Sequence, residues 1–78
     1  MSTELETRLF ESLVRRWGYI VGSAGLREVL AFSSQAALRR AIDLGHVPVH
    51  VFTITGRRGP FATAHDLAQW LSRQEPTG

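Results

Sequence analysis

The feature that most constrains this chain is a pair of short amphipathic segments, 23–30 and 35–44, with only four residues between them. Ser23 can cap a helix over the first segment, and either of the two serines before Gln35 can cap a helix over the second. Gly45 ends the second segment as a left-handed C-terminal cap requires. The pattern therefore predicts two short helices joined by a tight turn.

A longer amphipathic helix is predicted over residues 3–17. Its start has the Thr3 to Glu6 spacing of a capping box, and Gly18 ends it before a short extended link at 19–21. Large apolar residues recur at every fourth position and form one stripe: Leu5, Leu9, Leu13 and Trp17. Such a stripe can pack inside the domain core, or it can join two copies of the chain as a homodimer, and the sequence leaves both open.

A β-hairpin is predicted after the second short helix. Residues 47–55 are rich in valine and threonine and include phenylalanine and isoleucine, which is a strand composition. Residues 60–62 provide a return strand. Between the two, residues 56–59 have the sequence Gly-Arg-Arg-Gly, which is typical of a turn.

The remaining residues complete a single domain over 1–78, because a chain of this length holds one core. Thr63, with Asp66 at the capping spacing, begins a last helix, and residues 75–78 are expected to form a flexible tail. The order of the elements predicts a mainly helical α+β fold. More specifically, it predicts a winged helix-turn-helix over 19–73, with an additional N-terminal helix, a hairpin wing and a C-terminal helix.

Composition and spacing exclude several kinds of site. The chain has no cysteine, so it has no disulfide and no thiolate metal site. His46 and His50 are about 13 Å apart if the segment between them is extended, so one metal ion cannot bind both. Neither a nucleophile elbow nor a glycine-rich phosphate loop is present, so we expect no enzyme, no cofactor and no small-molecule substrate. No apolar run is long enough to span a membrane, so we expect a cytoplasmic protein with no membrane partner.

The basic residues of the chain are all arginine. Nine arginines stand against seven acidic residues, which gives a net charge of +2. Arginine has a planar guanidinium that pairs with phosphate oxygens or with the edge of guanine. The adjacent pairs Arg39-Arg40 and Arg57-Arg58 are therefore candidates for contacts to a nucleic acid. The other interpretation is that they are solvated surface residues.

The second short helix, 35–44, has a predicted exposed face that suits DNA. The helical period places its apolar residues toward the core: Ala37, Leu38, Ala41, Ile42 and Leu44. It leaves Gln35, Arg39 and Arg40 projecting together, and these side chains can form paired hydrogen bonds to base edges or bind phosphates. Ala36 is small enough to let the helix approach the bases.

Two further groups of residues suit the same partner. The hydroxyls of two serines and the free amides at the start of 35–44 can bind a phosphate. A hairpin tip carrying two arginines can follow a neighbouring groove or the DNA backbone. The predicted DNA-binding residues are Ser33, Ser34, Gln35, Arg39, Arg40, Arg57 and Arg58.

Three short motifs, in this order, resemble those of one family. Residues 38–48 are similar to a recognition helix that ends in glycine with a proline nearby. Residues 56–58 resemble a wing tip, and residues 66–71 resemble a closing helix with the pattern Asp-apolar-x-x-Trp-apolar. From residue 19 to 73 the chain thus resembles the AlpA/excisionase branch of the MerR-like winged helix-turn-helix proteins. Ala31 stands where these proteins carry a turn glycine.

The resemblance implies a function and a role for the site residues. By family role, the residues that face the major groove are Ser34, Gln35, Arg39 and Arg40. Arg57 and Arg58 are implied to contact the minor groove or the backbone. Proteins of this family act as transcription regulators or as accessory factors in the excision of phage, plasmid or island DNA. We therefore predict a sequence-preferring double-stranded DNA-binding protein. The alternative is a protein-interaction module that uses the apolar N-terminal helix and the hairpin edge.

Overall fold

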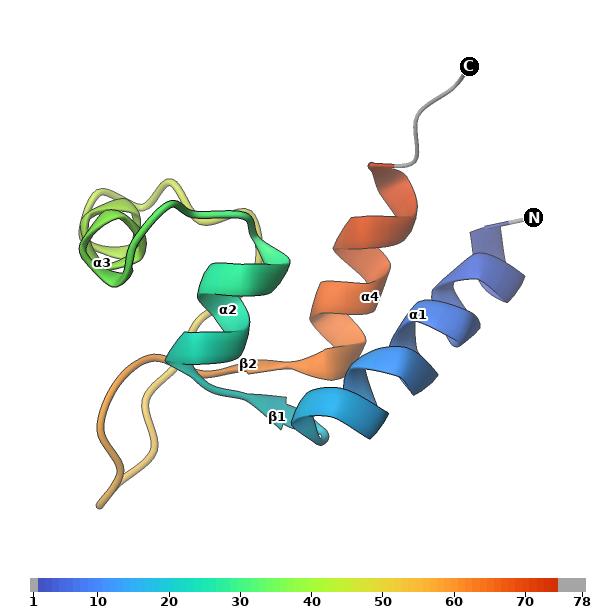
Figure 1. Ribbon diagram of the computed structural model, residues 1–78, viewed down its shortest axis with the longest axis horizontal. Helices are drawn as coiled ribbons and strands as arrows, with labels where there is room; N and C mark the ends of the chain where they lie inside the picture. The colour runs from blue at the N-terminus through green and yellow to red at the C-terminus, as the bar shows by residue number, and fades with distance from the viewer. Residues whose placement is uncertain (1, 75–78) are drawn as a thin grey trace.

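The computed structural model describes residues 2–74, with side chains from residue 4 onwards (Figure 1). Along the described chain the order of elements is α1 (Ser2–Trp17), β1 (Ile20–Val21), α2 (Ser23–Val29), α3 (Gln35–Asp43), β2 (Ala62–Thr63) and α4 (Ala64–Arg73). The mainly helical α+β class predicted from the sequence is therefore confirmed. None of these helices is long and apolar enough to cross a bilayer. The tail predicted at 75–78 lies outside the described residues.

Helices α1 and α4 lie side by side and run in opposite directions (Figure 1). Leu13 of α1 is buried in the same apolar core as Leu67 and Ala68 of α4, and Leu9 and Trp17 pack against this core from α1. The stripe of α1 is thus part of the core of one chain, which is the first of the two alternatives that the sequence left open. This packing lends no support to a dimer interface on the stripe.

A short antiparallel sheet joins the start of the α2–α3 pair to the start of α4. Ile20 of β1 pairs with Thr63 of β2, and Val21 pairs with Ala62. Val21 and Ala62 are fully buried, so this sheet passes through the centre of the core. The link predicted at 19–21 is therefore a strand at its last two residues.

The β-hairpin predicted from residues 47–55 and 60–62 is much shorter in the structure, so the prediction of its length is wrong. Residues 47–55 form no strand, and the only pairing between the two segments is an antiparallel bridge between Phe52 and Phe61. Its two backbone hydrogen bonds are 2.9 and 2.8 Å long. Pairing does not continue toward the tip, because Gly59, the next residue that would exchange hydrogen bonds with Ile54, has φ of +88°, outside the strand region, and the Ile54 carbonyl accepts instead from the Arg57 N–H at 2.9 Å. We use "the hairpin" below for residues 52–61.

Two of the predicted helix caps are confirmed. The Ser34 hydroxyl accepts a hydrogen bond from the Ala37 N–H at 3.0 Å, so Ser34 caps α3. The Thr63 hydroxyl accepts one from the Asp66 N–H, also at 3.0 Å, and caps α4. Both serve N–H groups that the first turn of a helix leaves without a partner.

The predicted cap of α2 is wrong. Gly22 occupies the cap position without any side-chain hydrogen bond, and Ser23 is the first residue of the helix. Gly22 is extended, with φ of −86° and ψ of −169°, which is the conformation that a cap residue adopts whether or not it has a side chain. The serine one position later is therefore not needed as a cap.

Gly45 ends α3 in the left-handed conformation, as predicted, although the helix stops at Asp43, one residue earlier than expected. Gly45 has φ of +73°, and the His46 N–H donates to the Ala41 carbonyl at 2.8 Å. The Gly45 N–H donates to the Ile42 carbonyl at 3.0 Å. These two bonds form a Schellman motif, in which glycine is favoured because the left-handed conformation strains other residues.

Candidate nucleic-acid interface

Helix α3 lies at the opposite end of the molecule from α1 and α4, with its axis pointing toward the viewer in Figure 1. It is held to the core by Leu38, which is 1% exposed, and by the partly buried Ile42. Arg39 and Arg40 are both exposed on it. The structure therefore leaves the face opposite Leu38 open to solvent.

Leu44 was predicted to face the core together with Leu38 and Ile42, and this is wrong. Helix α3 ends at Asp43, and Leu44 is 60% exposed in the turn that follows. The helical period no longer applies there, because Gly45 reverses the chain direction immediately afterwards. Leu44 thus adds apolar surface to the exposed side of α3.

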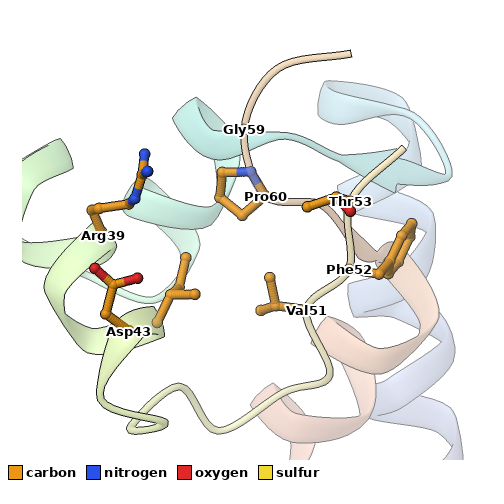
Figure 2. Close-up of a pocket in the computed structure, with 8 residues that line it drawn as sticks. Arg39, Asp43, Val51, Phe52, Thr53, Gly59 and Pro60 are labelled. Carbon is orange, nitrogen blue, oxygen red and sulfur yellow. The ribbon is translucent and has the colours of Figure 1, made fainter. Parts of the chain in front are cut away.

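Arg39 borders a hollow of about 330 Å³ between α3 and the hairpin (Figure 2). From the α3 side the hollow is lined by Arg39, Ile42 and Asp43. From the other side it is lined by the hairpin residues Phe52, Thr53, Gly59 and Pro60, and by Val51 just before the hairpin. Figure 2 shows the side chains of Arg39 and Asp43 rising from α3 on the same side. Asp43 is not among the residues singled out from the sequence, although its spacing of four residues from Arg39 is visible there.

Arg40 lies on a different side of α3 from Arg39. It lines a second, open hollow of about 550 Å³ together with Ala36, Leu44 and Phe32, on the side away from the hairpin. Consecutive residues of a helix are separated by about 100° around its axis, which explains the divergence. Arg39 therefore lies close to the hairpin and Arg40 lies away from it. The two side chains are both exposed, but they do not project in the same direction as the sequence predicted.

Gln35 is tied to α2. Its side-chain amide donates a hydrogen bond to the Ser23 carbonyl at 3.3 Å, and it lines a smaller hollow with Arg39 and Pro60. The predicted proximity of Gln35 and Arg39 is therefore present. In this conformation one donor of the Gln35 amide is already used to connect α3 to the first residue of α2.

The two serines before α3 are exposed, but they have local roles as well. The Ser34 hydroxyl caps α3, and the Ser33 carbonyl accepts a hydrogen bond from the Arg27 guanidinium at 3.4 Å. The same guanidinium nitrogen donates to the Phe32 carbonyl at 3.1 Å. Arg27 thus holds the turn that sets the position of α3 relative to α2.

Arg57 and Arg58 lie at the tip of the hairpin, which extends away from the body of the molecule (Figure 1). Gly56 before them and Gly59 after them both have positive φ, at +82° and +88°. Both arginine side chains are exposed. Among the described residues, no ion pair or side-chain hydrogen bond involves any of four arginines: Arg39, Arg40, Arg57 and Arg58.

Positive charge is concentrated in this half of the molecule. Residues 31–63 contain four arginines and a single carboxylate, that of Asp43. In α1 three arginines stand against three glutamates, and α2 and α4 each carry one charge of either sign. Arg16 of α1 also forms an ion pair with Glu28 of α2 at 3.0 Å. The excess positive charge of the described chain is therefore confined to the part that contains α3 and the hairpin.

The histidines are not arranged as metal ligands. His46 and His50 are both exposed on either side of Pro48. Within the described residues, no cluster of three or more histidine or acidic side chains could hold a metal ion. The groups that this face offers to a ligand are guanidiniums, one carboxylate and one amide.

Comparison of the chain with protein-family models, with curated proteins and with solved structures found no match. The resemblance to the AlpA/excisionase proteins therefore stays a prediction.

Proposed function

We propose that this chain is a sequence-preferring double-stranded DNA-binding protein of the winged helix-turn-helix type. In this proposal α3 enters the major groove, and the hairpin is a wing whose tip contacts the neighbouring backbone or minor groove. The resemblance to the AlpA/excisionase proteins makes the proposed role that of a transcription regulator or an accessory factor in DNA excision, and not that of an enzyme.

The observation that carries the proposal is the distribution of arginine. Six exposed arginine side chains have no ion pair or side-chain hydrogen bond among the described residues, and four of the six lie on α3 and on the hairpin tip. The other helices carry balanced charge. Guanidiniums that protein carboxylates leave unpaired are available to phosphate oxygens and guanine edges. A surface that merely needs to be soluble has no reason to concentrate them in one part of the molecule.

The dimensions of α3 support its role in the groove. It is a short helix of nine residues, and an α-helix with its side chains is about 10–12 Å in diameter. The major groove of B-DNA is about 12 Å wide and admits one α-helix. The exposed Ala36 adds little bulk to the open face, so the backbone of α3 can approach the bases.

The residues have different roles in this proposal. Arg39, next to Gln35, contacts base edges, and Arg40 binds a phosphate on the far side of α3. Ser33 and Ser34 lie beside the first amides of α3, which suit a further phosphate. At the wing tip, Arg57 and Arg58 neutralise phosphates with little sequence preference, because a turn between two glycines has no fixed geometry for bases.

The test begins with a duplex selected from a random library by repeated binding to the protein. Affinities for this duplex and for bulk random duplex are measured by fluorescence anisotropy over a series of salt concentrations. We expect both to weaken steeply with salt, because each neutralised phosphate contributes about −0.9 to the slope of log affinity against log salt. Selection that enriches no sequence, or binding without salt dependence, would contradict the proposal.

Variants then assign the contacts. Arg39→Ala should cost about 1–3 kcal/mol on the selected duplex and less on random duplex. The double change Arg57→Ala and Arg58→Ala should weaken both duplexes similarly and make the salt slope shallower by roughly two units. The matched control is the double change Arg15→Ala and Arg73→Ala, which removes two exposed arginines from α1 and α4. An equal effect of this control would mean that net charge alone drives binding.

The alternative function, a protein-interaction module, relied on the apolar stripe of α1 as a docking surface. That stripe packs against α4 within the chain, so this alternative retains only the hairpin edge. If the protein binds no duplex even at low salt, the result would favour the protein-interaction module over DNA binding.

A further inference from the structure

The carboxylate of Asp43 is unexpected at the C-terminal end of α3, where the neighbouring charged residues are arginines. It is the last residue of α3 and the only carboxylate between residues 31 and 63, on a face that otherwise carries arginines. It follows Arg39 by one helical turn, and both line the hollow between α3 and the hairpin (Figure 2). Even so, the ion pairs found in the described chain all involve α1, α2 or α4, and none includes Asp43.

The fold gains nothing evident from this carboxylate. The C-terminal end of a helix has a partial negative charge, so an acidic residue there is destabilising. A carboxylate near DNA also repels phosphates, so it weakens non-specific binding. A residue that supports neither the helix nor the electrostatic attraction of DNA is explained if it recognises a particular base.

We infer that Asp43 is a specificity-determining residue, which accepts a hydrogen bond from the exocyclic amine of a cytosine in the major groove while Arg39 pairs with a guanine. The inference rests on the proposed DNA-binding function and names the base that one residue selects. A carboxylate is a fitting acceptor for the cytosine amine, which is the only polar group that cytosine presents in that groove.

The helix geometry also gives the spacing of the two bases. Residues four apart rise by about 6 Å along a helix. Successive base pairs are about 3.4 Å apart. The cytosine that Asp43 selects therefore lies about two base pairs from the guanine that Arg39 contacts, if α3 follows the groove.

The test uses the full chain and the selected duplex, in which each base pair is changed in turn. For the unmodified protein, replacing one C·G pair about two steps from the Arg39-dependent G·C pair should weaken binding by about 5- to 150-fold. Asp43→Ala should abolish this discrimination and keep that at the Arg39 position. It should also bind random duplex more tightly, because one source of repulsion is gone. The matched control is Glu11→Ala, which removes an exposed carboxylate from α1 and should change neither property.

Thermal unfolding separates recognition from a structural role. Asp43→Ala should unfold at the same temperature as the unmodified protein or higher, because it removes a charge that the helix end disfavours. A variant that discriminates at every base pair as the unmodified protein does overturns the inference and leaves the proposed function intact. Equal weakening on all duplexes with a lower unfolding temperature also overturns it, in favour of a structural role. An unmodified protein that binds no duplex overturns both proposals.

Discussion

Ala31 is the one non-glycine residue with a positive φ in residues 2–74, at +62°. It follows Leu30, the C-cap of α2. Its N–H donates to the Glu28 carbonyl at 3.2 Å, and the Phe32 N–H donates to the Arg27 carbonyl at 2.9 Å. This is the hydrogen-bond pattern of a Schellman motif, whose left-handed position is usually glycine. We therefore expect Ala31→Gly to stabilise the protein.

Two opposing contributions set the magnitude. An L residue in the left-handed region costs about 1–2 kcal/mol, which glycine avoids. Glycine in turn increases the conformational entropy of the unfolded chain, which offsets about 0.5–1 kcal/mol of that gain. Ala31 is exposed, so losing its methyl group removes little buried apolar surface. The expected net stabilisation is about 0.5–1 kcal/mol, or roughly 2–8 °C in Tm for a domain of this size.

Gly45 provides the reciprocal change, because the same motif ends α3 with glycine in the left-handed position at φ of +73°. Nothing lies within 4 Å of a Cβ built at Gly45, so Gly45→Ala tests the backbone alone. It should destabilise by about the amount that Ala31→Gly stabilises. Both variants are measured by thermal and urea unfolding with far-UV circular dichroism. If Gly45→Ala destabilises and Ala31→Gly does not stabilise, the strain assigned to Ala31 is refuted.

Three further changes test the packing and one cap. Gly25→Ala should destabilise by about 1–3 kcal/mol, because a Cβ there would overlap Val21 Cγ1 and lie 2.9 Å from Trp17 Cδ2. Leu13→Ala should cost about 2–5 kcal/mol in urea unfolding, and the unmodified protein should sediment as a monomer at micromolar concentration, since the α1 stripe packs on α4. Ser34→Ala should cost about 1 kcal/mol through the loss of the α3 cap.

Each of these changes has an outcome that would contradict it. A fully stable Gly25→Ala protein would mean that α2 can move away from β1 at no cost. A dimer that Leu13→Ala dissociates into folded monomers would place the α1 stripe between two copies. Unchanged stability of the Ser34→Ala protein would show that solvent replaces the serine hydroxyl at the start of α3.

The helices could be predicted from the sequence because their signals are local. Capping by Ser34 and Thr63 needs a hydroxyl one position before the first turn, and the stop at Gly45 needs one residue that tolerates positive φ. All three relations span at most a few residues, so they are visible without knowledge of the fold. The cap assigned to Ser23 failed for the same kind of local reason, since Gly22 can take the cap conformation.

The strand pairing could not be predicted in the same way. Residues 62–63 pair with 20–21, far away along the chain, although the nearer segment 47–55 has the better strand composition. Gly59, with its positive φ, ends the pairing beyond Phe61, and this effect depends on where the turn places it. Strand composition describes a residue that fits a half-buried surface, and it does not select the partner.

The exposure of the two arginines on α3 could be predicted from the sequence, but the directions in which their side chains lie could not. Exposure of Arg39 and Arg40 follows from the helical period, and it is present. That the two line different hollows depends on where the hairpin lies beside α3, which is a tertiary relation. The bond from Gln35 to the Ser23 carbonyl also depends on the angle between α2 and α3. No sequence pattern indicates that angle.

The residues that stabilise the fold and the arginines proposed to bind DNA lie in different parts of the molecule. The arginines can therefore be substituted without unfolding the protein, which makes the binding proposals testable. The buried residues lie mainly on α4 and the sheet, with Leu13 on α1, Gly25 and Leu26 on α2, and Leu38 on α3. The four arginines contribute no ion pair to the described fold, and exposed residues of this kind change stability by less than about 0.5 kcal/mol. Their removal can therefore lower affinity for DNA without unfolding the protein. A change in salt slope or base preference in these variants then reports on contacts to DNA and not on the fraction of folded chains.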